Sequence, residues 1–257
     1  ETVVSDGEGI FEATFQNISP IIHPKEIVTF KLHHEAGLVP EKEYSKVRVM
    51  RFSSSYPVGI ISDIDDTILI SHATQIGKKF WLSVSKNAYT RRPFPGVSEL
   101  YKILTNDGKN PVFYVSSSDW NLNDLIKDFM HYRNIPAGPL LLKDLHVTLR
   151  NIWKSGGGSH THKEEKIQLL LNLYPDMKFI LIGDSGQHDP EIYASLIKRN
   201  PGRVVIVYIR QIKNNDVNRK SEMEKNILPK EVPEIIFVKN TEEAIAHARQ
   251  QKQLIEI

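Results

Sequence analysis

Short apolar runs alternate with amphipathic stretches along the chain from residue 58 to its end. Apolar runs that stop at turn-forming residues are typical of buried parallel strands, and apolar positions three and four residues apart are typical of helices. The predicted strands span 58–64, 111–116, 139–142, 178–182, 203–209 and 235–238, and the predicted helices span 97–105, 121–132, 162–173, 190–198 and 241–253. Strands that alternate with helices indicate parallel βαβ units. We therefore expect an α/β fold, a Rossmann-like three-layer sandwich with a mainly parallel sheet.

A different pattern covers the first 57 residues. Segments 10–15, 27–32 and 46–50 alternate apolar and polar positions with period two, as half-buried antiparallel strands do, and Pro and Gly residues separate them. The sequence therefore predicts two domains, a small β-rich N-terminal lobe over residues 1–57 and a larger α/β domain over residues 58–257.

Composition changes this picture little, because it is that of an ordinary globular protein. Of 257 residues, 40% are hydrophobic and 25% are charged, and a net charge of +2 gives no reason to expect a nucleic-acid partner. The absence of Cys excludes disulfides and a Cys nucleophile, and no apolar run is long enough for a transmembrane segment. The chain begins at Glu1, so we expect a trimmed N-terminus; cytoplasmic and exported locations both stay open, as does the oligomeric state. Segment 213–225 carries both charge signs and is interpreted as a solvated loop or helix face.

Candidate chemistry begins where the first predicted strand of the larger domain ends. Asp63, Asp65 and Thr67 lie in the segment Asp-Ile-Asp-Asp-Thr, and their two-residue spacing puts both carboxylates on the same side of the chain. One carboxylate can attack phosphorus and form an aspartyl-phosphate, while the other protonates the leaving oxygen and later activates water. The alternative is an acidic turn in which Asp or Thr caps a helix.

A serine run follows the next predicted strand and begins at Ser116. A hydroxyl at this position, together with free backbone N–H groups, can hold a phosphoryl oxygen. A serine-rich turn that leads into the following helix is the alternative interpretation.

Two lysines, Lys163 and Lys166, lie on the predicted helix that starts near His162. An ammonium directed at the nucleophile would neutralise charge in the transition state, although lysines on helices usually face water. His160 and His162 follow three glycines, and we interpret them as ordinary exposed residues rather than as a metal-binding pair.

A glycine-rich acidic segment, residues 183–189, follows the strand predicted at 178–182. Gly183 allows the backbone to approach its neighbours closely, and Asp184 and Asp189 flank a loop that could bind a cation. Asp189 could also cap the helix that begins at Pro190. Because the carboxyl ends of parallel strands meet at one edge of the sheet, we expect both acidic clusters to lie there, as in a metal-dependent phosphoryl-transfer site.

Together these residues resemble the signatures of the haloacid dehalogenase superfamily of phosphohydrolases. The DxDxT signature is matched at Asp63, Asp65 and Thr67, and the small-residue signature is matched at Ser116. The lysine signature is matched at Lys163, and the GDxxxxD signature is matched at Asp184 and Asp189. The sequence around these signatures resembles one branch of the superfamily, the phosphatidate phosphatases of the actin-patch-protein type found in fungi and bacteria. The segments that carry this resemblance are 61–68, 114–122, 162–163 and 182–193. The resemblance covers about residues 58–209 and departs from the family pattern at Asp119, where we expect Pro before Trp120. His162 favours Lys163 over Lys166 as the family's lysine.

The resemblance implies an enzyme that hydrolyses a phosphomonoester with Mg²⁺, most specifically phosphatidate to diacylglycerol and phosphate. It assigns Asp63 as the nucleophile and Asp65 as the acid and base. The implied phosphate-binding residues are Thr67, Ser116 and Lys163. The implied Mg²⁺ ligands are the Asp63 carboxylate, the Asp65 backbone carbonyl and Asp184, with Asp189 in support or as a direct ligand.

Substrate choice depends on what covers the site. The insertions at about 68–95 and 135–161 are too short for a full cap domain, so we expect a small or absent cap, which suits a bulky substrate such as a lipid headgroup at a bilayer surface. An amphipathic rim that contacts anionic lipid could include Phe80, Trp81, Phe94, Trp120, Trp153, Lys78, Lys79, Arg91 and Arg92. Core aromatics and a solvated basic loop are the alternative. Two other functions stay open, a phosphatase for soluble, protein or nucleic-acid phosphomonoesters and a non-catalytic scaffold.

Overall fold

The computed structural model describes residues 3–4, 27–31, 44–48, 50, 56, 58–70, 92–143, 159–212, 217–226 and 233–255. Contacts within the chain divide it into two units, Glu1–Arg51 and Phe52–Ile257. None of the helices described in these ranges combines the length and the apolar composition that are needed to cross a bilayer.

The first unit contains an antiparallel pair of strands, β1 (Ile27–Lys31) and β2 (Tyr44–Arg48), in which Ile27 lies opposite Arg48. The two strands correspond to the predicted segments 27–32 and 46–50, and β2 lies two residues nearer the N-terminus than expected. The strand predicted at 10–15 lies outside the described residues. The N-terminal lobe as a separate domain, with its boundary after residue 57, stays a prediction.

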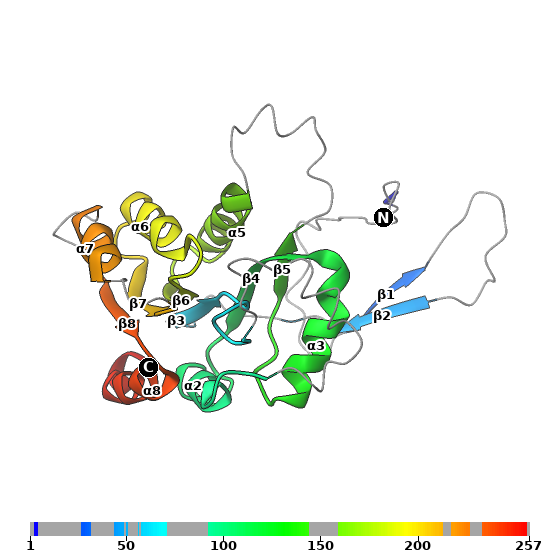
Figure 1. The fold of residues 1–257 in the computed structure, drawn as a ribbon. Helices are drawn as coiled ribbons and strands as arrows, with labels where there is room; N and C mark the ends of the chain where they lie inside the picture. The colour runs from blue at the N-terminus through cyan, green and yellow to red at the C-terminus, as the bar shows by residue number, and fades with distance from the viewer. Residues whose placement is uncertain are drawn as a thin grey trace. The chain divides into compact units, whose positions relative to one another are not determined.

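The second unit is built on a sheet of six parallel strands in the order β5-β4-β3-β6-β7-β8 (Figure 1). The strands are β3 (Val58–Ser62), β4 (Val112–Asp119), β5 (Leu140–Lys143), β6 (Lys178–Asp184), β7 (Val204–Arg210) and β8 (Glu234–Val238). This arrangement confirms the predicted α/β class with a Rossmann-like parallel sheet.

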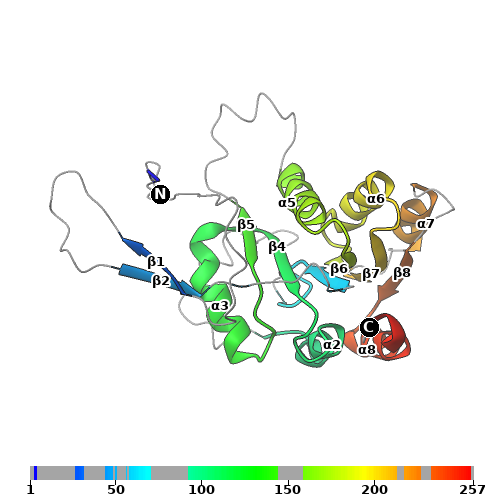
Figure 2. The same ribbon diagram turned by 180° about the vertical axis from the view of Figure 1, so that it is seen from behind.

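Helices cover both faces of this sheet. They are α2 (Val97–Leu104), α3 (Asn123–Tyr132), α5 (Ser159–Leu173), α6 (Asp189–Arg199), α7 (Val217–Asn226), α8 (Thr241–Gln250) and α9 (Lys252–Ile255). Figures 1 and 2 show α5, α6 and α7 on one face and α2, α3 and α8 on the other. The result is the predicted three-layer sandwich.

Several element boundaries differ from the sequence prediction, three of them in the type or continuity of the element. Strand β4 runs on to Asp119, so the serine run belongs to the strand rather than to a turn. A 3₁₀ turn, Trp120–Leu122, precedes α3, where we expected the helix itself to begin. The single helix predicted at 241–253 is divided at Gln251, which is the C-cap of α8.

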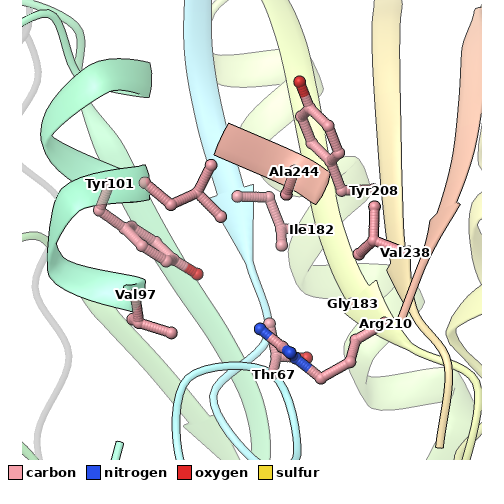
Figure 3. Close-up of a pocket in the computed structure, with 10 residues that line it drawn as sticks. Thr67, Val97, Tyr101, Ile182, Gly183, Tyr208, Arg210, Val238 and Ala244 are labelled. Atoms are coloured by element: carbon pink, nitrogen blue, oxygen red, sulfur yellow. The ribbon is translucent and has the colours of Figure 1, made fainter. Parts of the chain in front are cut away.

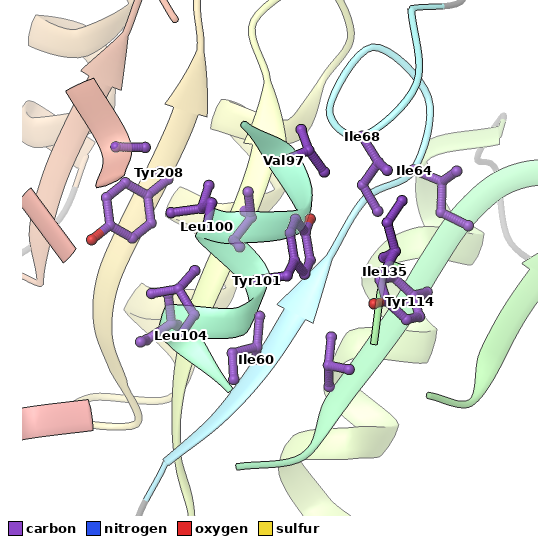
Figure 4. Packing of buried hydrophobic residues seen from close by; sticks show 14 of the residues in the cluster. Ile60, Ile64, Ile68, Val97, Leu100, Tyr101, Leu104, Tyr114, Ile135 and Tyr208 are labelled. Carbon is purple, nitrogen blue, oxygen red and sulfur yellow. The ribbon is translucent and has the colours of Figure 1, made fainter. Parts of the chain in front are cut away.

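The core lies on both faces of the sheet because each strand contributes side chains to both. Ile60, Ile180 and Ile206 belong to the cluster that packs against α2, α3 and α8, and Figure 4 shows Ile60 beside residues of α2. Their neighbours in sequence, such as Ile61, belong to a second cluster that packs against α5, α6 and α7. Complete burial of one such side chain stabilises a fold by roughly 1.5–3 kcal/mol. Burial on both faces explains why the strands read as continuous apolar runs.

The strand order also fixes where a site can form. From β3 the chain passes to β4 and β5 on one side, and it then returns to β6 on the other side of β3. The carboxyl ends of β3 and β6 therefore flank the point at which the winding of the sheet reverses, where open α/β sheets bind their ligands. Asp63 directly follows β3, and Asp184 ends β6.

Candidate active site

Asp63 is held rigidly at the carboxyl end of β3. Its backbone N–H donates to the carbonyl of Ile182 on β6 at 2.9 Å, and its side chain is almost completely buried. Lys163 of α5 places its Nζ 3.0 Å from Oδ1 of Asp63. The hydroxyl of Thr67 lies 3.5 Å from Oδ2 of the same carboxylate. The structure thus brings three of the predicted site residues together around one carboxylate.

Lys163 joins the two predicted acidic clusters. Its ammonium also donates to Oδ1 of Asp189, at the start of α6, and only 2% of the residue Lys163 is exposed. Lys166, the other candidate, is half-buried one turn further along α5. Of the two lysines, only Lys163 forms ion pairs with both Asp63 and Asp189.

The acidic loop after β6 directs its own backbone at Asp184. Oδ1 of Asp184 accepts from the N–H groups of Gly186 at 2.6 Å and of Gln187 at 3.0 Å. Oδ2 of Asp184 is buried, and no group in the described part of the chain donates to it. A buried carboxylate oxygen without a donor is costly, so this atom is a natural ligand for a cation.

Asp189 supports the same loop from the start of α6. Its Oδ2 accepts from the backbone N–H of Asp184 at 3.1 Å. A Cβ on Gly183 would lie 2.3 Å from that oxygen, which explains why the sequence has Gly there. The alternative in which Asp189 caps α6 is wrong, because His188 is the N-cap and no side-chain cap hydrogen bond forms, whereas Pro190 lies in the first turn as predicted.

Asp63, Asp184 and Asp189 form a buried group that fits a divalent cation. Each offers a carboxylate oxygen, and these three atoms all lie within 4.8 Å of one another. Three carboxylates and one buried ammonium leave an excess of negative charge, which is unfavourable away from water. Carboxylate oxygens are the hard ligands that Mg²⁺ prefers, and Oδ2 of Asp184 is available to it. The residues present therefore fit the predicted cofactor.

Burial and mutual repulsion shift the protonation of this group. Burial raises the pKa of Asp63 well above its usual value; Lys163 opposes the shift, and Asp189 adds to it. Burial and the charge of Asp189 raise the pKa of Asp184 to about 7. Burial alone would lower the pKa of Lys163, but Asp189 and Asp63 outweigh it and raise that pKa, so the amine stays charged at neutral pH. A bound cation would favour the ionised carboxylates.

Asp65 has partners of its own. Its Oδ2 accepts from the hydroxyls of Ser116 at 3.1 Å and Ser118 at 2.7 Å, both on β4. The carboxylate of Asp65 is not part of the three-carboxylate group, which is compatible with a metal-binding role for its backbone carbonyl alone. Asp66 follows with a φ of 53°, in the left-handed region, and turns the chain back on itself. The carboxylates of Asp63 and Asp65 therefore have different partners, Lys163 and the serine hydroxyls of β4, although the two residues are only two positions apart.

Ser118 is a site residue that sequence reasoning did not single out. It lies within the predicted serine run, and its backbone N–H donates to the Ser116 hydroxyl at 2.9 Å. A signal was present, because residues two apart on an extended strand point to the same face. The prediction of a turn at this position hid that signal.

Arg210 is a second residue near the site that sequence reasoning did not single out. It ends β7 and is largely buried. Its guanidinium lies 3.9 Å from the centroid of the Phe94 ring, and Nη2 donates to the Thr241 hydroxyl at 2.9 Å. Figure 3 shows Arg210 and Thr67 among the residues that line a small pocket beside the site. Phe94 is partly buried against the core. For Phe94 the alternative of a core aromatic is therefore favoured over a lipid-facing rim.

The other expected rim and loop residues divide into two groups. Trp120 is 42% exposed at the end of β4, and Arg92 is exposed as well. Residues Phe80, Trp81, Trp153, Lys78, Lys79 and Arg91 lie outside the described part of the chain. Asp119 has a φ of −69°, close to the value that a proline ring fixes, so the backbone shape expected for Pro is kept.

Of the two histidines before Lys163, His162 differs from the expectation of an exposed residue. His162 is half-buried rather than exposed, and its Nε2 lies 3.1 Å from the carbonyl oxygen of Leu142 on β5. This contact anchors the first turn of α5 to the sheet, next to Lys163. The side chain of His160 is outside the described residues.

Fold and site together define a doubly wound α/β domain with a buried carboxylate–lysine centre at the reversal of its sheet. Residues 58–211 match the family described as the catalytic domain of phosphatidate phosphatase APP1, and the chain belongs to this family. The match confirms the predicted resemblance to phosphatidate phosphatases of the actin-patch-protein type, and it agrees with the predicted enzyme class of phosphoric monoester hydrolases.

Two curated relatives are similar over much of this chain. Phosphatidate phosphatase APP1 of Saccharomyces cerevisiae is 32% identical over 164 residues, which is 64% of this chain and 27% of the yeast protein. The uncharacterized protein C29B5.04c of Schizosaccharomyces pombe is 27% identical over 220 residues, 82% of this chain and 36% of the relative. The chain thus spans about a third of the length of these relatives or less.

The solved structures that are similar in part include the following two. A haloacid dehalogenase-like hydrolase from Burkholderia xenovorans has a TM-score of 0.43 at 11% identity, over 74% of this chain and 98% of that chain. A chain of the Pnkp1/Rnl/Hen1 complex has a TM-score of 0.40 at 14% identity, over 66% of this chain and 54% of that chain. These TM-scores add no support beyond the family match.

Proposed function

We propose that this domain hydrolyses phosphomonoesters through an aspartyl-phosphate intermediate, with Mg²⁺ as cofactor and phosphatidate as substrate. The observation that carries the proposal is the buried group in which Lys163 lies between Asp63 and Asp189, beside Asp184. A positioned carboxylate nucleophile, a fixed cation and available carboxylate oxygens are what phosphoryl transfer requires. Membership of the phosphatidate phosphatase family supports the same reaction.

The proposed reaction has two steps that use the two aspartates of the first cluster. In the first, a carboxylate oxygen of Asp63 bonds to phosphorus while the bond from phosphorus to the ester oxygen breaks. The departing oxygen keeps that electron pair and takes a proton from the carboxyl group of Asp65, so the alcohol leaves neutral. In the second, Asp65 takes a proton from water as the water oxygen attacks phosphorus and the bond to Asp63 breaks. The products are the alcohol and phosphate.

The remaining site residues hold the phosphoryl group and the cofactor. Lys163 and Ser116 would bind non-bridging phosphoryl oxygens, and Thr67 would order the loop beside them. The Asp63 carboxylate, the Asp65 carbonyl and Asp184 would hold Mg²⁺, with Asp189 in support or as a ligand. Bound Mg²⁺ supplies charge neutralisation at the phosphoryl oxygens.

The chemistry itself is tested by the variant Asp63→Asn, which keeps the size of the side chain and removes the nucleophile. We expect loss of Mg²⁺-dependent phosphate release, and loss of the acid-stable, hydroxylamine-labile phosphoenzyme that the wild type forms with labelled substrate. Asp107→Asn is a matched control, because Asp107 is exposed and lies in the turn before β4, at the opposite end of that strand from the site. Near-normal turnover by Asp63→Asn would refute the assignment.

The lipid substrate is supported by the family and by the exposed Trp120 at the edge of the sheet where the site lies. Trp is favoured at membrane interfaces because its ring is amphipathic. We expect Mg²⁺-dependent release from phosphatidate vesicles to exceed that from nucleotides, sugar phosphates and phosphopeptides. Trp120→Ala should lower the rate on vesicles more than on a soluble short-chain phosphatidate, while Tyr132→Ala, at an exposed aromatic of α3, should not. Equal rates on soluble substrates and none on vesicles would point to a soluble phosphomonoester instead.

A further inference from the structure

Arg219 reaches into the acidic loop from outside the segment that the family match covers. It lies on α7, whereas the match ends at residue 211. Its Nη1 donates to the carbonyl of Ser185, and its Nη2 donates to the carbonyl of Gln187 at 3.1 Å and to Oε1 of Glu191 at 2.9 Å. Helices α6 and α7 lie side by side in Figures 1 and 2. The segment predicted to face solvent thus supplies a cation to the loop that carries Asp184.

The contact with Ser185 acts on the peptide unit that orients Asp184. The carbonyl of the Ser185–Gly186 peptide accepts from Arg219, and the N–H of the same peptide donates to Oδ1 of Asp184 at 2.6 Å. A charged donor on the carbonyl polarises the peptide and strengthens the hydrogen bond that its N–H makes. It also fixes the peptide plane. With Oδ1 of Asp184 engaged in this way, Oδ2 is the oxygen left to a cation.

Ser185 itself is fixed on its other sides by the strand next to the loop. Its backbone N–H donates to the carbonyl of Arg210 at 2.9 Å, and its hydroxyl accepts from the N–H of Ile212 at 2.9 Å. Only 1% of Ser185 is exposed. Strand β7 therefore sets the position of the loop, while Arg219 acts on the carbonyls of Ser185 and Gln187, which determine how the loop peptides are turned.

We propose that Arg219 is a positioning residue that turns the Ser185–Gly186 peptide so that Asp184 presents Oδ2 to the divalent cation. The inference rests on the metal site of the proposed function. The planar guanidinium matters because its donors reach two carbonyls and a carboxylate at the same time, which a lysine cannot reproduce. Groups that orient metal ligands typically change metal affinity by about 10- to 100-fold when removed.

The test is Mg²⁺ binding by titration calorimetry to wild type, Arg219→Ala and Arg219→Lys, with folding checked by circular dichroism in EDTA. We expect Arg219→Ala to weaken Mg²⁺ binding by about 10- to 100-fold and Arg219→Lys to lie between it and the wild type. At saturating Mg²⁺ the kcat of both variants should return close to the wild-type value, because no group that touches substrate has been removed. Lys225→Ala, at an exposed position of the same helix, is the matched control and should bind Mg²⁺ as the wild type does.

Three other outcomes overturn the inference. If Arg219→Ala folds, binds Mg²⁺ with wild-type affinity and shows only a lower melting temperature in EDTA, Arg219 is a purely structural contact of α7 and does not position Asp184. A loss of kcat that saturating Mg²⁺ does not restore would contradict a role through Asp184. If the wild type itself binds no Mg²⁺, the metal site of the proposed function fails together with this inference. If Arg219→Ala does not fold, the comparison of Arg219→Lys with the wild type decides in the same way.

Discussion

The Nζ of Lys163 lies 3.0 Å from Oδ1 of Asp63 and forms a second ion pair with Oδ1 of Asp189, and all three side chains are buried. The contact joins helix α5 to the ends of β3 and the start of α6. It keeps the Asp63 carboxylate, the proposed nucleophile, beside a positive charge, and it offsets part of the repulsion among the acidic residues. Stability and chemistry therefore depend on the same ammonium.

Lys163→Met is expected to abolish phosphate release and to destabilise the fold by about 3–5 kcal/mol, because it leaves buried carboxylates without their cation. Urea unfolding in EDTA measures the stability, and a phosphatase assay measures the activity. Lys166→Met is the control: Lys163 makes the ion pairs with Asp63 and Asp189, so we expect a much smaller change when the half-buried Lys166 is replaced. Equal effects of the two substitutions on activity and stability would contradict the specific role proposed for Lys163.

Gly183→Ala is expected to destabilise the protein by roughly 1–3 kcal/mol and to weaken Mg²⁺ binding, because its Cβ would meet Oδ2 of Asp189 at 2.3 Å. Gly108→Ala provides the comparison. Its Cβ has no neighbour within 4 Å, but its φ of +89° is strained for alanine, so it should destabilise without any change in Mg²⁺ affinity. Melting temperatures in EDTA and calorimetric titration with Mg²⁺ separate the two effects, and unchanged Mg²⁺ binding by Gly183→Ala would be the contrary result.

Ser118→Ala removes the shorter of the two hydroxyl contacts to the Asp65 carboxylate. A hydrogen bond to a charged group is worth about 1.5–3 kcal/mol, so kcat should fall roughly ten- to hundredfold if Asp65 is the acid and base. Mg²⁺ affinity should not change, since the Asp65 carboxylate is not in the three-carboxylate group. Ser98→Ala, at an exposed hydroxyl that donates to the Asn134 carbonyl, should leave kcat unaffected. Wild-type kcat in Ser118→Ala would exclude Ser118 from orienting Asp65.

The raised pKa of Asp184, about 7, predicts how pH and Mg²⁺ act on stability. The folded protein holds a proton that the unfolded chain, with an Asp pKa of about 3.9, releases. The free energy of unfolding of the metal-free protein should therefore fall as pH rises from about 4 to about 7. Mg²⁺ needs the ionised carboxylate, so its stabilising effect should grow over the same range. Melting temperatures with EDTA and with Mg²⁺ at several pH values test this; a stabilisation by Mg²⁺ that is independent of pH would argue against ligation by Asp184.

The fold was predictable because strand and helix signals depend on local patterns. Each of the six predicted strands of the larger domain has a counterpart in the parallel sheet, since burial on both faces imposes continuous apolar runs. Boundaries were less accurate where local and tertiary preferences compete. Strand β4 continues through the serine run because Ser116 and Ser118 face Asp65, a partner 51 and 53 residues away in sequence. Nothing in the local pattern records such a partner.

Residue types and spacing in the sequence by themselves determined the acidic clusters, the family and the parallel sheet that brings strand ends to one edge. Only the tertiary structure decided that Asp189 pairs with Lys163 instead of capping α6, that Phe94 stacks on Arg210, and that Arg219 holds the acidic loop. The physical reason is the same in each case. These side chains have more than one acceptable local partner, and burial against distant segments selects among them, because a buried charge must find its counterpart wherever the fold places it.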